Sequence, residues 1–194
     1  MYYPRKLAEL LEKQISSKQI IVLTGMRRVG KTTLYKELFK KIKSENKVFL
    51  DIENPIEQKV FEEADYNNIW ANLKQYNISS KQKAYLFLDE IQAMPSIVKA
   101  IKYLYDHYQV KFFLTGSSSF YLKNLFPESL AGRKFIFELY PLDFEEFLVF
   151  NGRQKKFYKS FFQKEKNKNY IGFEKVKKLY DWASEFGGFP QVVL

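Results

Sequence analysis

A glycine loop set between an apolar run and a helical pattern is the feature that most restricts how this chain can fold. Residues 25–32 read Gly-Met-Arg-Arg-Val-Gly-Lys-Thr and match the pattern G-x-x-x-x-G-K-[ST] at every fixed position. The preceding residues 20–23 are all apolar and predict a buried strand, while residues 33–44 carry apolar side chains at helical spacing. A strand, a glycine turn and a helix in this order predict an α/β domain with a phosphate-binding loop.

The chemistry of this loop follows from its two glycines and its last residues. Glycine lets the backbone curve so that N–H groups point inward, and the positive end of the following helix adds to the attraction for phosphate. Lys31 is expected to reach the β- and γ-phosphates of a nucleotide, and the Thr32 hydroxyl is expected to bind Mg²⁺. We therefore predict that ATP or ADP binds here with Mg²⁺ (the Walker A pattern), through Gly25, Met26, Arg27, Arg28, Val29, Gly30, Lys31, Thr32 and Thr33. For the two arginines, pairing with acidic side chains under the loop is the alternative.

Two carboxylates supply the second half of the same chemistry. Residues 85–88 form an apolar, strand-like run that ends in Asp89 and Glu90, and Asp89 follows Lys31 by 58 residues. Asp89 is suited to hold Mg²⁺, and Glu90 can polarise a water for attack on the γ-phosphorus. A glutamate beside the metal aspartate (the Walker B pattern) favours hydrolysis. A P-loop kinase is the less favoured alternative, because the arginines of this chain form no compact lid.

The remaining pattern alternates strands with helices. Further apolar runs predict strands, and apolar side chains at helical spacing predict helices between them. Uninterrupted apolar strands are typical of a parallel sheet covered on both faces, with ligands at the carboxyl ends of the strands. The predicted fold class is α/β, a P-loop NTPase with a parallel five-stranded sheet sandwiched between helices and a basic helical C-terminal extension. The additional strands are expected at 47–52, 112–116 and 133–137, and the additional helices at 5–17, from 96 onward and at 142–150, with mixed helical sequence over 57–76.

Charge is concentrated near the end of the chain. The sequence carries 32 basic and 22 acidic residues, a net charge of +10, and residues 151–178 alone hold ten basic and two acidic residues. We therefore expect an ATP-binding domain over 1–150 and a basic linker or helical segment over 151–194. Aromatic side chains are interleaved with these lysines, so the segment is either a solvated helix or a binding surface for DNA or RNA.

Composition excludes several other classes of site. The chain has no cysteine and one histidine, His107, so disulfides, a thiol nucleophile and a two-histidine metal site are excluded. The first residues lack an apolar signal-peptide core, and no apolar run approaches the length of a membrane span. We expect a cytoplasmic protein with no membrane partner.

Several blocks of sequence are similar to those of AAA+-type P-loop ATPases. More narrowly, the chain resembles bacterial and archaeal ATPases whose AAA domain is commonly followed by a C-terminal domain of unknown function. Members of that group continue beyond the stretch that corresponds to 187–194, so we expect this chain to hold only the start of such a domain. The matching blocks are residues 24–33, 88–92, 114–119, 130–133 and 140–147.

The resemblance implies further roles at this site. It implies that Thr115 or Ser117 is a polar sensor that orients the attacking water. As an alternative, Ser117, Ser118 and Ser119 could cap the helix that begins near Phe120. It also implies that Arg133 is an arginine finger toward a neighbouring copy or a sensor within the same copy, whereas a surface ion pair is the alternative. The implied function is an ATPase core that uses nucleotide as a conformational switch, in a homo-oligomer or with a partner protein. The alternative is a basic nucleic-acid-binding module in which nucleotide only stabilises the fold.

Overall fold

The computed structural model describes residues 2–117, 130, 132–152 and 170–193. Contacts divide the chain into two compact units. The first, which we call the sheet unit, comprises Leu7–Gly25 and Lys31–Leu139. The second, which we call the terminal unit, comprises Met1–Lys6, Met26–Gly30 and Tyr140–Leu194. The domain boundaries expected from the sequence, 1–150 and 151–194, remain a prediction.

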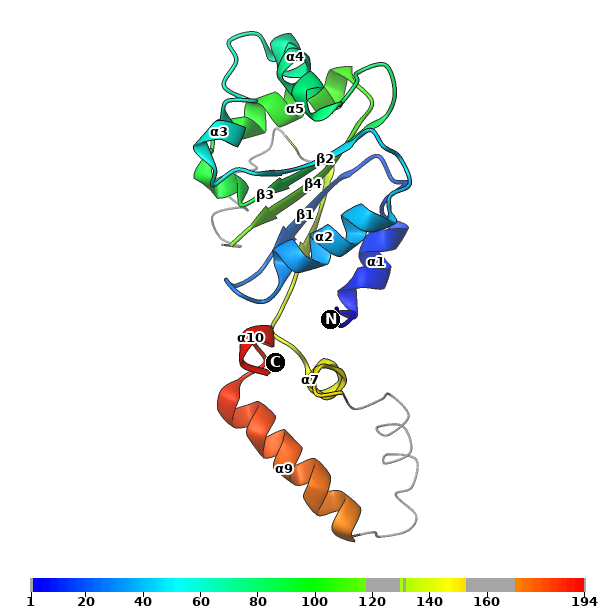
Figure 1. The fold of residues 1–194 in the computed structure, drawn as a ribbon, viewed down its shortest axis with the longest axis vertical. Coiled ribbons are helices and arrows are strands. Elements are labelled where there is room, and N and C mark those ends of the chain that lie inside the picture. Colours follow the sequence, from blue (N-terminus) through cyan, green and yellow to red (C-terminus); the bar gives the residue numbers. More distant parts are fainter. Residues whose placement is uncertain (1, 118–129, 131, 153–169, 194) are drawn as a thin grey trace. The chain divides into compact units, whose positions relative to one another are not determined.

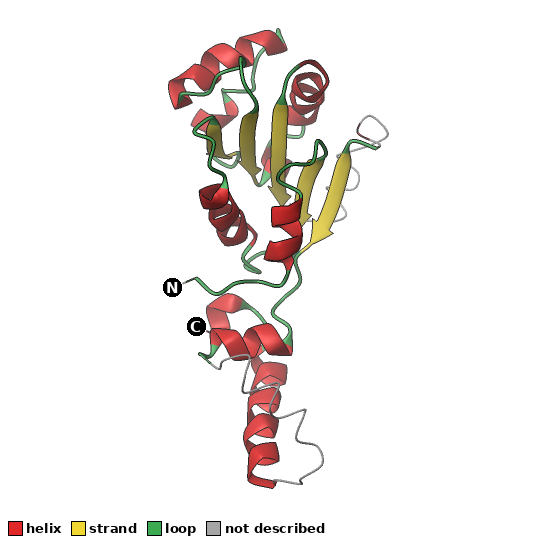
Figure 2. Ribbon diagram, turned by 90° about the vertical axis from the view of Figure 1, so that its right-hand side faces the viewer, coloured by secondary structure: helices red, strands yellow, loops and turns green. Residues whose placement is uncertain are grey.

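The sheet unit holds five parallel strands in the order β2-β3-β4-β1-β5. Figure 2 shows these strands side by side in yellow. This confirms the predicted α/β class and the predicted parallel sheet. The strands are β1 (Ile20–Thr24), β2 (Lys47–Asp51), β3 (Ala84–Asp89), β4 (Val110–Gly116) and β5 (Lys134–Glu138). Helix α1 (Leu7–Lys13) precedes β1. The helices between the strands are α2 (Lys31–Lys41), α3 (Pro55–Gln58), α4 (Ile69–Leu73) and α5 (Ile97–His107), with short 3-10 turns η1 (Tyr66–Asn68), η2 (Lys74–Tyr76) and η3 (Ile91–Ala93).

Helices cover both faces of the central strands (Figure 1). On one face, Tyr35 of α2 makes edge-to-face contacts with Phe87 and Phe113, at centroid distances of 5.6 and 5.8 Å. On the other face, α4 and α5 pack into a cluster with the buried alternate residues of the strands, such as Leu86 and Leu88. Side chains alternate in direction along a strand, so an uninterrupted apolar run can pack against helices on both sides.

Two expectations differ from the structure at the margins of this unit. The edge strand β5 is less covered than predicted, because Phe135 and Ile136 keep 43% and 39% of their surface exposed. The helix expected over 5–17 is shorter and spans Leu7–Lys13. After it, the Ser17 hydroxyl donates to the Gln14 carbonyl in a turn, which is a local bond that competes with helix continuation.

The terminal unit is helical. It contains α7 (Phe144–Phe150), α9 (Tyr170–Phe186) and α10 (Pro190–Val193). Asp143 and Glu146 form a reciprocal capping box that starts α7, which explains why the predicted helix begins at this point. Gly188 lies against the chain before α7, where an added Cβ would be 2.3 Å from the Leu142 carbonyl oxygen. Among the described helices, none has the length and apolar character that would let it cross a membrane.

Candidate functional site

The C-terminal ends of β1, β3 and β4 form one edge of the sheet, and this carboxyl edge brings together the polar residues at or just after these strand ends. In the parallel register, Thr24 pairs with Gly116, Leu23 with Thr115, and Asp51 with Asp89. Parallel strands that are in register end at one edge, so the predicted lysine, carboxylates and sensor residues meet there.

Lys31 is the first residue of α2 and is almost fully buried. Its Nζ donates to the Gly25 carbonyl at 3.0 Å and lies 4.0 Å from Glu90 Oε1. A buried ammonium needs such partners, since burying an unpaired charge is costly. The side chain is therefore held between the start of the loop and the end of β3.

Asp89 lies among hydroxyl groups. Its carboxylate accepts hydrogen bonds from Thr115 Oγ1 and from the Thr32 side chain. Burial raises the pKa of Asp89, the two hydroxyl hydrogen bonds lower it, and the charges of Glu90 and Asp51 raise it further, so that the pKa lies above its usual value. A divalent cation would relieve this repulsion, and carboxylate and hydroxyl oxygens are the ligands that Mg²⁺ takes in proteins. The residues present therefore fit a magnesium ion.

Glu90 occupies an unusual backbone conformation. Its φ of 52° and ψ of 49° lie in the left-handed region, which residues other than glycine, asparagine and aspartate rarely adopt. The Thr115 hydroxyl accepts a hydrogen bond from the Glu90 backbone N–H at 3.0 Å, so one threonine contacts both neighbouring acidic residues. Strained backbone of this kind is found at functional sites more often than elsewhere.

Gln92 completes this edge, and the sequence assigned it no role. Its Nε2 donates to Glu90 Oε2 at 2.6 Å and to Ser117 Oγ at 3.1 Å. The side chain therefore links the predicted water-polarising carboxylate to one of the two predicted sensor residues. Gln92 belongs to the block 88–92 that carries the family resemblance, and this membership is the sequence signal that could have identified it as a site residue. Phe120, where the alternative role of Ser117 as a helix cap would apply, lies outside the described residues.

The P-loop, residues 25–32, has a backbone that changes direction repeatedly. Positive φ angles occur at Gly25 (144°), Arg28 (67°) and Gly30 (97°). A Cβ at Gly25 would lie 2.2 Å from the Leu139 carbonyl oxygen, so only glycine fits at the first fixed position. Successive N–H groups in such turns can form anion-binding concavities. The remaining predicted nucleotide-binding residues differ in exposure: Met26, Arg27, Arg28 and Thr33 are exposed, Thr32 is half-buried and Val29 is buried.

Arg133 does not join this edge. Its carbonyl accepts a hydrogen bond from Ile20 N, at the amino end of β1, so Arg133 lies at the opposite edge of the sheet. Its Nε pairs with Asp106 Oδ1 at 2.9 Å, as in the alternative of a surface ion pair. A sensor role within the same copy does not fit this position, and contact with a neighbouring copy stays a prediction.

A cluster of ligands for a transition metal is absent from the part of the chain that the structure describes. There, no group of three or more histidine, cysteine, aspartate or glutamate side chains could hold a metal ion. His107 ends α5, and its ring contacts that of Tyr103 in a tilted arrangement at a centroid distance of 4.4 Å. We assign it no function. The fit of Mg²⁺ therefore depends on mixed hydroxyl and carboxylate oxygens.

Known proteins resemble this chain in sequence and in fold. An uncharacterized protein of Methanocaldococcus jannaschii is 31% identical over 195 residues, which cover 97% of this chain and 40% of that protein. Among solved structures, a Walker-type ATPase of Pyrococcus abyssi aligns with a TM-score of 0.61 at 16% identity, over 99% of this chain and 66% of that one. The Drosophila ORC bound to DNA aligns with a TM-score of 0.55 at 14% identity, over 92% of this chain and 55% of that one.

These likenesses differ in what they establish. At such low identity, the two solved structures show a shared fold and nothing more. The chain spans about two-fifths of the length of the archaeal relative. The AAA domain family matches residues 17–148, which is more than half of the chain and includes the P-loop, Asp89, Glu90 and Thr115. The chain therefore belongs to the AAA domain family of P-loop ATPases.

Proposed function

We propose that this chain is an ATP-binding, Mg²⁺-dependent ATPase core that uses nucleotide as a conformational switch. One observation carries the proposal: the buried Lys31 ammonium lies 4.0 Å from Glu90, beside an Asp89 carboxylate bonded by Thr32 and Thr115. This combination supplies a cation for phosphate, oxygens for a metal and a carboxylate for water at one edge.

Each residue then has a separate task. Backbone N–H groups of the P-loop bind the phosphate chain, and Lys31 exchanges its contact with the Gly25 carbonyl for the β- and γ-phosphates. Thr32 and Asp89 would hold Mg²⁺, which would neutralise charge on the phosphates when bound. Glu90 polarises the attacking water, and Thr115 fixes the backbone of Glu90 through its N–H.

The switch rests on the contacts of Glu90. In this structure Glu90 lies near Lys31 and accepts a hydrogen bond from Gln92, which also donates to Ser117. When Lys31 turns to phosphate, Glu90 loses its nearby cation and turns from Gln92 toward the attacking water, so that Gln92 no longer bridges Glu90 and Ser117. Occupancy of the site is thereby coupled to Ser117, the last described residue before position 130.

Phosphate release by a Glu90→Gln variant tests this function. The amide keeps the size of the side chain and loses its basicity, so ATP binding should persist while hydrolysis falls by about 100-fold or more. Glu37→Gln is the matched control, because this glutamate on α2 forms its ion pair with the exposed Lys40 of the same helix. Release of phosphate at the parent rate by Glu90→Gln would remove Glu90 from the mechanism.

Nucleic-acid binding is the second candidate, and it rests on the charge of residues 151–178. Most of that segment lies outside the described residues, although α9 begins at Tyr170. Replacing Lys155, Lys156, Lys159, Lys164, Lys166 and Lys168 with Gln should leave ATP affinity unchanged. Under this candidate, the logarithmic salt slope of DNA or RNA binding should become shallower by about 0.7–0.9 for each phosphate that the variant no longer neutralises. An unchanged slope and affinity would leave the segment as a solvated helix or linker. Transfer of phosphate to a small acceptor would instead support a kinase.

A further inference from the structure

Arg5 makes a set of buried contacts in the terminal unit that the ATPase chemistry above does not use. Its guanidinium donates through Nη1 to the Val29 carbonyl at 2.7 Å and through Nη2 to the Tyr140 carbonyl at 2.6 Å. Its Nε donates to Glu146 Oε1 at 3.0 Å. The arginine side chain is 6% exposed and that of Glu146 is 8% exposed, so the pair is shielded from water. One arginine thus joins the P-loop backbone to α7 and to the chain that leads into it.

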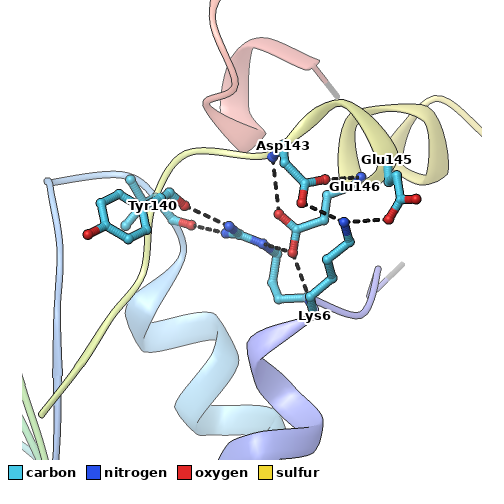
Figure 3. Close-up of polar contacts among 7 residues, drawn as sticks. Lys6, Tyr140, Asp143, Glu145 and Glu146 are labelled. Carbon is cyan, nitrogen blue, oxygen red and sulfur yellow. Dashed lines mark hydrogen bonds and ion pairs between the residues drawn. The ribbon is translucent and has the colours of Figure 1, made fainter.

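The partner of Arg5 is itself held in place (Figure 3). Besides Arg5, Glu146 Oε1 accepts the Lys6 backbone N–H at 2.8 Å, and Glu146 Oε2 accepts the Asp143 backbone N–H at 3.2 Å. Asp143 returns the contact by accepting the Glu146 N–H at 2.9 Å. A carboxylate with three donors has little freedom to move, and it therefore fixes the orientation of the guanidinium.

The contact with Val29 matters because of the geometry of the next peptide group. The described peptide bonds are all trans, and in a trans peptide the C=O and the following N–H point in opposite directions. Holding the Val29 carbonyl toward Arg5 therefore directs the Gly30 N–H away from Arg5. Gly30 is the second fixed glycine of the P-loop, and its φ of 97° lies in a region that glycine adopts readily. Because glycine has no Cβ, sterics at Gly30 do little to fix this peptide.

We propose that Arg5 is a positioning residue of the P-loop, which orients the Gly30 N–H toward the bound phosphates by holding the Val29 carbonyl. The inference rests on the proposed function, since it needs phosphate at the loop. A hydrogen bond from a charged donor is stronger than one from a neutral donor. Here it holds the Val29 carbonyl, and the orientation of that carbonyl sets the direction of the Gly30 N–H, one of the few backbone donors available to phosphate. Arginine suits the role because its planar fork reaches three acceptors at once, which a lysine ammonium at this position does not.

The test compares Arg5→Lys with Lys6→Gln in the full chain. Lys6 is the matched control, since its Nζ pairs with the half-exposed carboxylates of Asp143 and Glu145 at the start of α7, whereas Arg5 binds the P-loop backbone. The readout is the amide resonance of Gly30, with ATP and Mg²⁺ as the probe. Labelling valine carbonyls and glycine amides selects this residue alone, because the dipeptide Val-Gly occurs once in the sequence.

The proposal predicts a displaced Gly30 resonance in nucleotide-free Arg5→Lys and an ATP affinity lower by about tenfold. Lys6→Gln should keep both the parent resonance and the parent affinity. If Arg5→Lys does not fold, Glu146→Gln takes its place. The amide oxygen still accepts a hydrogen bond from Arg5, but loss of the negative charge weakens the contact that orients the guanidinium. A smaller displacement in the same direction is then expected.

Two results would overturn the proposal. One is a parent-like Gly30 resonance and ATP affinity in a folded Arg5 or Glu146 variant. The other is an equal loss of affinity in Lys6→Gln, which would mean that any loosening of α7 has the same effect. Failure of the parent itself to bind ATP would reject the proposed function instead. The nucleotide-free resonance would then still show whether Arg5 sets this peptide.

Discussion

Replacing Glu90 by glycine should stabilise the protein relative to replacing it by alanine. Both changes remove the same side-chain contacts, with Gln92 and Lys31, so the comparison isolates the backbone. At a φ of 52°, a residue with a Cβ incurs about 1–2 kcal/mol that glycine avoids. Glycine loses about 0.5–1 kcal/mol more conformational entropy on folding. The central values of these two ranges leave a net difference of about 0.75 kcal/mol in favour of Glu90→Gly.

Thermal unfolding measures this difference directly. For a chain of this size, about 1 kcal/mol corresponds to about 2–4 °C in melting temperature. The control pair is Lys36→Gly and Lys36→Ala at an exposed position in α2, where the order should reverse by about 1 kcal/mol in favour of alanine. Both Glu90 variants should also lose hydrolysis. An alanine variant that melts at or above the glycine variant would refute the argument that Glu90 is strained.

Two further predictions concern ionisable groups. Asp89→Asn removes a metal-binding charge, so the gain in ATP affinity on adding Mg²⁺ should shrink toward zero. Titrations of ATP with and without Mg²⁺ measure this gain, and a gain equal to that of the parent would exclude Asp89 as a ligand of the metal. Burial, together with the charge of Lys83, lowers the pKa of Lys111 to about 7. In the unfolded chain the pKa of a lysine is about 10.4. The unfolded state therefore binds more protons between these values, so this group's contribution to stability rises with pH from about 7 to about 10. Melting temperatures at pH values in that interval should rise more in the parent than in Lys111→Met, and equal rises would contradict this linkage.

The sequence predicted the sheet because its signals are local. Each central strand contains an uninterrupted apolar run, and β1 and β4 are buried along their whole length. The P-loop pattern likewise fixes glycine where a Cβ would meet the Leu139 carbonyl. From the order of strands and helices alone, the parallel sheet brings Lys31, Asp89, Glu90 and Thr115 to one edge.

Contacts between distant parts of the chain were beyond such signals. Arg5 and Glu146 are 141 positions apart, and nothing near Arg5 indicates a buried partner. The predicted helix over 5–17 would have put Arg5 on a helical surface, whereas α1 begins two residues later. Arg133 is similar: the sequence identifies a strand start, while only the sheet register reveals that it lies at the end of the sheet opposite Asp89 and Thr115.

Equilibrium binding of ATP with Mg²⁺ to the parent chain and to Lys31→Ala tests the central claim most directly. Lys31 is a buried residue of the P-loop, and a hydrogen bond from a charged group contributes about 1.5–3 kcal/mol. The parent should bind ATP, and Lys31→Ala should bind it about ten- to a hundredfold more weakly. Lys40→Ala on the exposed side of α2 should match the parent. Equal ATP affinity in the parent and in a folded Lys31→Ala protein would contradict the assignment of this loop as the nucleotide site.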